Sequence, residues 1–221
     1  MRQEREIVTN QATETYKILR DKILSGEFRP TQRLTEAKVV KELGVSRNHV
    51  RMAFQRLVFD GLIDLEPNQG AAVSDVTLED ILDVFVTREA LELEAYRRAY
   101  SRMGEADLVA LEALFTQMRD AIDENDFELY STSATNFRTM ILEIADSPHL
   151  KKLADSLLLI TGRVVLRKIM IPLRGKSSLS EHKALVAAFK QSSIEELEMA
   201  FRNHMSCLKA DIEQYWEIVK P

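Results

Sequence analysis

Cysteine is almost absent from this chain, since Cys207 is the only one among 221 residues. An intrachain disulfide framework is therefore excluded, and such a composition is typical of a reducing compartment. No apolar run reaches the ~18 residues that indicate a transmembrane helix. The first residues also lack the apolar stretch of a secretory signal. We expect a soluble, cytoplasmic protein that does not associate with a membrane.

An excess of positive charge is also missing, because the formal net charge of the chain is −5. Residues 1–75 hold 12 Lys and Arg against 11 Asp and Glu, whereas the remainder holds 18 against 24. The N-terminal part is thus free of the acidity found in the rest. This asymmetry is weak evidence for a polyanionic partner of the N-terminal part, because local patches matter more than totals.

Glycine is scarce, with seven residues, and four of these fall in the first 70: Gly26, Gly44, Gly61 and Gly70. They separate short periodic segments, as expected in a small domain with tight turns. Periodicity and capping residues predict helices over about 11–25, from Thr35 to Leu43, and from Ser46 to about 60. The alternation in 62–66, the turn 67–70 and the apolar 71–76 predict a two-stranded ribbon.

From Thr77 onward the hydrophobic period is helical throughout. The pattern predicts a long helix to about Met103, followed by helices near 105–124, 127–145, 149–170, 180–190 and 194–217. Ser180 is the expected start of the fifth of these. The fold class is therefore mainly α, with an N-terminal domain over 1–75 and an all-α bundle over 76–221.

The helix after Ser46 gathers polar side chains at its first turn: Arg47, Asn48, His49 and Arg51. Val50, Phe54 and Leu57 lie on the opposite side at helical spacing and are expected to anchor it. The major groove of DNA admits one α-helix, and Arg to guanine or Asn to adenine are favoured pairings. The helix is suited to reading base edges, although a merely solvated helix start is the alternative for these residues alone.

The segments "ILSGEFRP", "LGVSRNHVRMAFQRL" and "DGLIDLEPNQGAAV" resemble the winged helix-turn-helix of the GntR family of bacterial regulators. The resemblance covers residues 11–75 and implies contacts to bases or phosphates by Arg33, Arg47, Asn48 and Arg51. It also implies that Gln69 and Gly70 form the tip of the wing and reach the neighbouring minor groove. The complete predicted DNA-binding set is Arg33, Ser46, Arg47, Asn48, His49, Arg51, Gln69 and Gly70.

Two departures from the family pattern stand out. The family usually has Pro-Gly where this chain has Pro30-Thr31, which we expect to alter only a turn. It usually has Thr-Pro where this chain has Asn48-His49. The second change lies at the reading positions, so the operator sequence of relatives cannot be transferred to this chain.

The C-terminal part resembles the FCD domain, the effector module of a large GntR subfamily. The supporting segments are "VFVTREALELEAYRRA", "NFRTMILEIADSPHLKKL", "SEHKALVAAF" and "FRNHMSCL". Many FCD domains bind a divalent metal through an Asp or Asn, a His four residues later, and two further His. His182 and His204 match the last two, but the first two positions hold Ala134 and Arg138, which are not ligands. No metal or other cofactor is expected with certainty, and both histidines can instead be buried, hydrogen-bonded residues.

Arg138 suggests that a fixed cation takes over the metal's role of binding an anion. A guanidinium holds a carboxylate or phosphate through two parallel hydrogen bonds. The predicted effector-binding residues are Arg88, Arg138, Arg163, His182 and His204, and the predicted ligand is a small organic acid. The alternative is that Arg138 forms an internal ion pair or reaches solvent.

These features predict a transcriptional repressor that binds double-stranded operator DNA as a homodimer and responds to a carboxylate. Two alternatives stay open. One is a metal-binding or enzymatic bundle with a DNA-binding head, against which the sequence shows no nucleophile with a base. The other is a DNA-binding protein whose bundle takes no effector.

Overall fold

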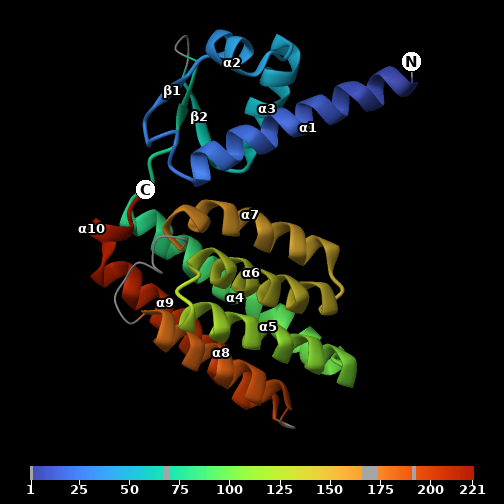
Figure 1. The fold of residues 1–221 in the computed structure, drawn as a ribbon, viewed down its shortest axis with the longest axis vertical. Coiled ribbons are helices and arrows are strands. Elements are labelled where there is room, and N and C mark those ends of the chain that lie inside the picture. The colour runs from blue at the N-terminus through green and yellow to red at the C-terminus, as the bar shows by residue number, and fades with distance from the viewer. Residues whose placement is uncertain (1, 67–69, 166–173, 191–192) are drawn as a thin grey trace. The chain divides into compact units, whose positions relative to one another are not determined.

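The computed structural model describes residues 2–66, 70–165, 174–190 and 193–221, and gives the backbone alone for 2–10, 66, 163 and 165 (Figure 1). The chain divides into two compact units. The first, called the head below, comprises 1–77 with 156–163 and 220–221, and the second, the bundle, comprises 78–155 and 164–219. The sequence-based domain limits, 1–75 and 76–221, stay a prediction.

The head has the predicted order of helices and ribbon. Its elements are α1 (Arg2–Leu24), β1 (Arg33–Leu34), α2 (Glu36–Leu43), α3 (Arg47–Phe59), β2 (Ile63–Glu66) and β3 (Gly70–Val73). The strands form an antiparallel sheet in the order β1-β3-β2, with Leu34 opposite Ala71 and Leu65 opposite Ala71 on the other side. The sequence did not predict β1, because two residues carry no readable period and depend on β3 for their hydrogen bonds.

Local capping chemistry sets the turn between α2 and α3. The Thr35 hydroxyl accepts a hydrogen bond from the backbone N–H of Lys38, and the Ser46 hydroxyl accepts one from that of His49, each at 3.3 Å. Gly44 ends α2 in the left-handed region, at φ 66°, where a side chain is disfavoured. The predicted caps and turn are thereby confirmed.

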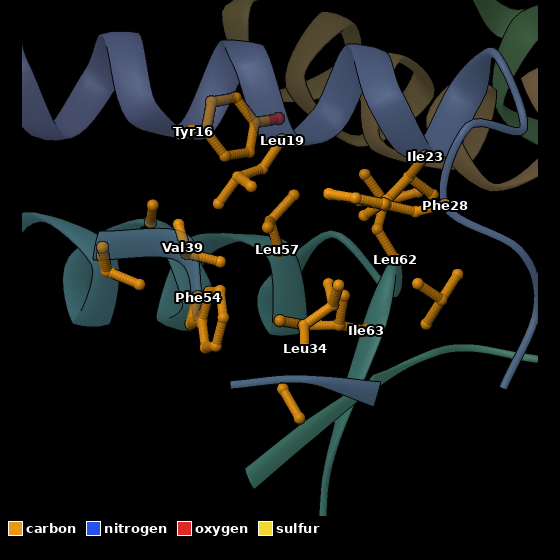
Figure 2. Close-up of a cluster of buried hydrophobic side chains, with 14 residues drawn as sticks. Tyr16, Leu19, Ile23, Phe28, Leu34, Val39, Phe54, Leu57, Leu62 and Ile63 are labelled. Carbon is orange, nitrogen blue, oxygen red and sulfur yellow. The ribbon is translucent and has the colours of Figure 1, made fainter. Parts of the chain in front are cut away.

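An apolar cluster holds the head together (Figure 2). Tyr16, Leu19 and Ile23 point from α1 toward α3, where Leu57 meets them. Leu19, Ile23 and Leu57 are at most 1% exposed. The expected inner face of α3 is confirmed, because Val50, Phe54 and Leu57 are all buried. The helix that carries the polar first turn is therefore fixed from behind.

The bundle is entirely helical over its described residues. Its helices are α4 (Leu78–Arg102), α5 (Glu105–Asp123), α6 (Phe127–Ile144), α7 (Pro148–Val165), α8 (Arg174–Lys190), α9 (Ile194–Gln214) and α10 (Trp216–Val219), of which residues 156–163 of α7 are counted with the head. None of the helices described combines the length and apolarity that crossing a bilayer requires.

The expected start of α8 at Ser180 is wrong, since the helix already begins at Arg174. Arg174 explains the difference, because its buried guanidinium donates to Ser177 and Glu181 one and two turns further along. These bonds within the helix stabilise turns that have little apolar periodicity. Such a signal is not visible in a hydrophobicity pattern.

Candidate DNA-reading face and bundle site

The first turns of α3 present three exposed polar side chains: Arg47, Asn48 and Arg51. The side chains of Arg47 and Arg51 are 68% and 61% exposed. Ser46, also exposed, caps the helix and so fixes where this turn begins. The arrangement offers long donors at the leading end of a rigidly anchored helix, which is the geometry that the major groove accommodates.

His49 does not belong to this exposed group, although the sequence placed it there. The residue is only 6% exposed, and among the described residues its Nδ1 has no hydrogen-bond partner. The reason is the helical period: His49 lies four residues before Ala53, which is also buried. Its burial argues against His49 as a DNA contact.

Of the two predicted wing residues, the structure describes Gly70. Gly70 begins β3 at φ 90° and is exposed, whereas Gln69 lies outside the described residues. Because φ of Gly70 lies in a region that residues with a side chain rarely adopt, the position is strained for other residues. Arg33 is exposed on β1, next to β3 in the same sheet. Arg33 and Gly70 thus lie on neighbouring strands.

In the bundle, two of the predicted effector residues meet on one carboxylate that the sequence analysis did not select. The Nε atoms of Arg88 and Arg138 both donate to Oε1 of Glu92, at 3.0 and 2.9 Å. All three side chains are at most 10% exposed. Burial alone raises the pKa of Glu92, but the two guanidinium groups outweigh it and lower that pKa. Glu92 therefore stays ionised.

Arg138 also binds α7. Its terminal nitrogens donate to the Ala154 carbonyl oxygen at 2.8 Å and to Asp155 at 3.3 Å. Asp155 is shared with Lys151 at 2.8 Å. Arg138 therefore makes an internal ion pair, the alternative that the sequence left open. Three of its five N–H donors are used by these contacts.

The two predicted histidines are neighbours, with ring centroids 4.9 Å apart at an angle of 73°. Nδ1 of His182 lies 2.8 Å from the Ser178 carbonyl oxygen, and Nδ1 of His204 lies 2.8 Å from Oε2 of Glu181. A carbonyl and a carboxylate only accept, so both Nδ1 atoms carry the proton. Both histidines are thus built into the hydrogen bonding of the bundle.

Glu181 is the centre of this second cluster. Arg174 donates to both of its oxygens, at 2.5 and 3.0 Å, and also pairs with Asp211. Burial alone raises the pKa of Glu181, but the hydrogen bonds from His204 and Arg174 outweigh it and lower that pKa to about 2.

These residues do not fit the metal site to which His182 and His204 correspond. Ala134 has no donor atom, and Arg138 is a cation engaged with Glu92. Among the described residues no group of three or more His, Cys, Asp or Glu could hold a metal ion. The side chain of Arg163, the remaining predicted effector residue, lies outside the part that the structure describes.

Comparison with known families matches two models to successive parts of the chain. Residues 83–206 match the FCD domain, and residues 11–73 match the bacterial regulatory proteins of the gntR family. The chain belongs to the GntR family. It is a DNA-binding transcriptional regulator with an FCD domain, and this family consists of transcription regulators rather than enzymes.

Several relatives of this GntR regulator are similar along nearly the whole chain. The transcriptional repressor RspR of Escherichia coli is 26% identical over 90% of this chain and 87% of its own. The gluconate operon repressor of Bacillus subtilis is 23% identical over 90% and 83%. The solved structure of E. coli McbR/YncC superimposes with a TM-score of 0.78 at 23% identity, covering 93% and 98%, and shows the shared fold.

The GntR regulator also contains residues that sequence reasoning missed. Glu92 follows Arg88 by four residues on the same helix, a spacing at which opposite charges meet, so the sequence carried a usable signal for it. Glu181 stands beside His182 in the sequence, but nothing local indicated that its carboxylate faces Arg174 and His204. Such pairings between helices depend on tertiary structure.

Proposed function

We propose that this GntR regulator is a repressor that binds its operator as a homodimer, with α3 of each copy in the major groove. Arg47 and Asn48 contact bases, and Arg51 contacts a base or phosphate. The single observation that supports this is the exposed first turn of α3 on a helix fixed by a buried face. One helix reads few bases, whereas two heads on a two-fold axis read a pseudo-palindrome.

The neighbouring contacts follow from the sheet. Arg33 on β1 binds a phosphate, and Gly70, with Gln69 before it, approaches the adjacent minor groove. Both relatives described above, RspR and the gluconate operon protein, are named repressors, which supports repression as the mode of action. The protein then acts in the cytoplasm of a bacterial cell, where its operator is found.

The bundle binds a small organic anion, and Arg138 is its principal contact. Glu92 is 4% exposed as a side chain and holds Nε of Arg138, whereas Asp155 is 42% exposed and lies farther away at 3.3 Å. Asp155 is therefore the partner that a ligand carboxylate replaces most easily. Arg88 supports Arg138 through their common Glu92, and His182 and His204 are further polar contacts that the same bundle offers the anion.

Replacement of Asp155 has a structural consequence within the bundle. Arg138 is the group that binds α7 at Ala154 and Asp155, so a ligand that takes over its donors weakens the hold on α7. A ligand shifts a conformational equilibrium only by binding one state better than the other. The competition between Asp155 and the ligand supplies this difference.

Titration calorimetry on metal-stripped protein tests the effector site. The ligands are a panel of monocarboxylates, dicarboxylates and sugar acids, with gluconate included. Arg138→Ala should weaken binding at least tenfold, Asp155→Asn should tighten it several-fold by removing the competing carboxylate, and Arg202→Ala is the matched control. Arg202 is an exposed arginine of α9 that pairs with Glu89.

If the Arg138→Ala protein binds the acid as tightly as the wild type, Arg138 is not part of the effector site. A protein that binds DNA but none of these acids at millimolar concentration would favour the second candidate function, a DNA-binding protein whose bundle takes no effector. The internal ion pairs of Arg138 are the observation that favours that second candidate.

A further inference from the structure

An acidic residue lies among the cations of the proposed reading face. Glu36, in the first turn of α2, faces both arginines of α3: its Oε2 lies 3.7 Å from Nε of Arg47 and its Oε1 lies 3.3 Å from Nε of Arg51. The two arginines are one helical turn apart, so one carboxylate with two oxygens reaches both. Its own side chain is 32% exposed.

The position of Glu36 is fixed by the local fold. Thr35 caps α2 directly before it, and the turn at Gly44 returns the chain so that the start of α3 lies beside α2. Glu36 also lies at the positive end of the α2 dipole. The head thereby holds the carboxylate of Glu36 close to the guanidinium groups of Arg47 and Arg51. None of these three side chains is buried.

Stability does not account for this arrangement. Ion pairs between exposed side chains contribute little to folding, because water and salt screen them. A carboxylate beside a phosphate-binding surface also repels DNA. The pairing therefore lowers affinity for every DNA sequence, and this loss must be offset by another effect on binding.

The geometry indicates that effect. In both pairs the arginine atom nearest to Glu36 is Nε. Nε of Arg51 donates a hydrogen bond to Glu36, whereas Nε of Arg47 is attracted to it at a longer distance by charge alone. In both pairs Glu36 lies at the inner edge of the guanidinium and leaves the two terminal amino groups for other acceptors. Those amino groups make the bidentate contact to O6 and N7 of guanine. A phosphate gains much less from a fixed orientation, because it can be approached from many directions.

We propose that Glu36 is a positioning residue that determines specificity in the reading head. It holds Arg47 and Arg51 in the orientation that suits base edges and weakens their attraction to phosphates of any sequence. This inference rests on the proposed DNA contacts of the two arginines. It adds that discrimination against non-operator DNA depends on an acid that does not itself touch DNA.

The test compares Glu36→Gln with Glu42→Gln. Glu42 lies on the same helix and pairs with Lys22 at 2.9 Å, away from the two arginines, so both variants change the net charge of the head equally. Fluorescence anisotropy measures binding to two duplexes at several potassium chloride concentrations. One duplex is selected from a random pool by the wild-type protein, and the other is a shuffled version with the same composition.

We expect Glu36→Gln to bind the shuffled duplex about threefold to tenfold more tightly per head. The slope of log affinity against log salt should steepen by ~1 per head, as for one added phosphate contact. Affinity for the selected duplex should rise less, so that the ratio of the two affinities falls several-fold. Glu42→Gln should shift both duplexes by the same smaller factor, and Glu36→Asp should recover part of the ratio.

Two results would overturn the inference. In the first, Glu36→Gln and Glu42→Gln change the affinities for the two duplexes by the same factors. Glu36 would then act only through its contribution to the net charge. In the second, Glu36→Gln weakens both duplexes while the thermal unfolding of the protein is unchanged. Different results would contradict the proposed function itself. These are that the wild-type protein selects no sequence from the random pool, or that the Arg47→Ala and Arg51→Ala variants bind the selected duplex as tightly as the wild type.

Discussion

Glu181 offers the sharpest test of the energetics of the bundle. Its carboxylate accepts two hydrogen bonds from Arg174 and one from His204, and the residue is 7% exposed. Glu181→Gln keeps the shape but replaces one acceptor oxygen by a donor. One of the three donors around it then faces another donor. Among the described residues, Arg174 then keeps Asp211 as its anionic partner.

The magnitude follows from the pKa of Glu181, which falls from 4.5 to about 2 in the folded protein. At ~1.4 kcal/mol per pKa unit, the ionised carboxylate contributes about 3 kcal/mol to the free energy of unfolding. Removing one member of a buried ion pair typically costs about 3–5 kcal/mol, which is consistent. We therefore expect Glu181→Gln to lower the unfolding free energy by about 3 kcal/mol at neutral pH.

The loss should depend on pH with a defined sign. Because the folded-state pKa lies below the unfolded-state value, the contribution is complete above pH 4.5 and is lost as the pH falls toward 2. The difference between wild type and variant should fall to about half its neutral value near pH 3.

Urea unfolding of both proteins between neutral pH and about pH 3 provides the measurement. The single tryptophan, Trp216, lies in α10 of the bundle, so its fluorescence reports on this unit. Glu198→Gln, which removes a surface carboxylate paired with Arg97, is the control and should behave like the wild type. A loss below ~1 kcal/mol, or one that is the same at every pH, would refute the reasoning.

Three further substitutions probe the head, with hydrogen exchange of its amides as the common assay. Thr31→Gly should stabilise it by ~1 kcal/mol, because Thr31 has φ 61° and its strain exceeds the entropy cost of glycine; a loss contradicts this. Ser46→Ala should cost about 1 kcal/mol by removing the cap of α3, and no change speaks against the cap. Tyr16→Phe should cost about 2 kcal/mol, because it removes the 2.6 Å hydrogen bond to buried Asp60; unchanged exchange of α1 excludes this.

Apart from β1, the elements of the head could be predicted from the sequence because their signals are local. Glycine at the end of α2, capping hydroxyls before α2 and α3, and apolar residues at helical spacing each act within a few residues. The long helices of the bundle were predictable for the same reason. The order of the elements therefore followed from these local signals, whereas the family was indicated by the resemblance of whole motifs.

The candidate sites were predictable only in part. The sequence indicated that Arg47, Asn48 and Arg51 begin a helix with an anchored inner face, and the structure exposes all three. It could not show that His49 turns inward, because one step around a helix decides between groove and core. Whether the exposed residues touch DNA stays a prediction.

What only the tertiary structure decided is which charges meet. Arg138 and Glu92 are 46 residues apart in sequence, and Arg51 and Glu36 are 15 apart. The sequence established that this chain has arginines in a helical bundle and a polar helix start, because composition and period are properties of the chain itself. It did not establish their partners, because a hydrogen bond to a carboxylate requires contact within about 3 Å, and only the packing of separate helices brings such groups together.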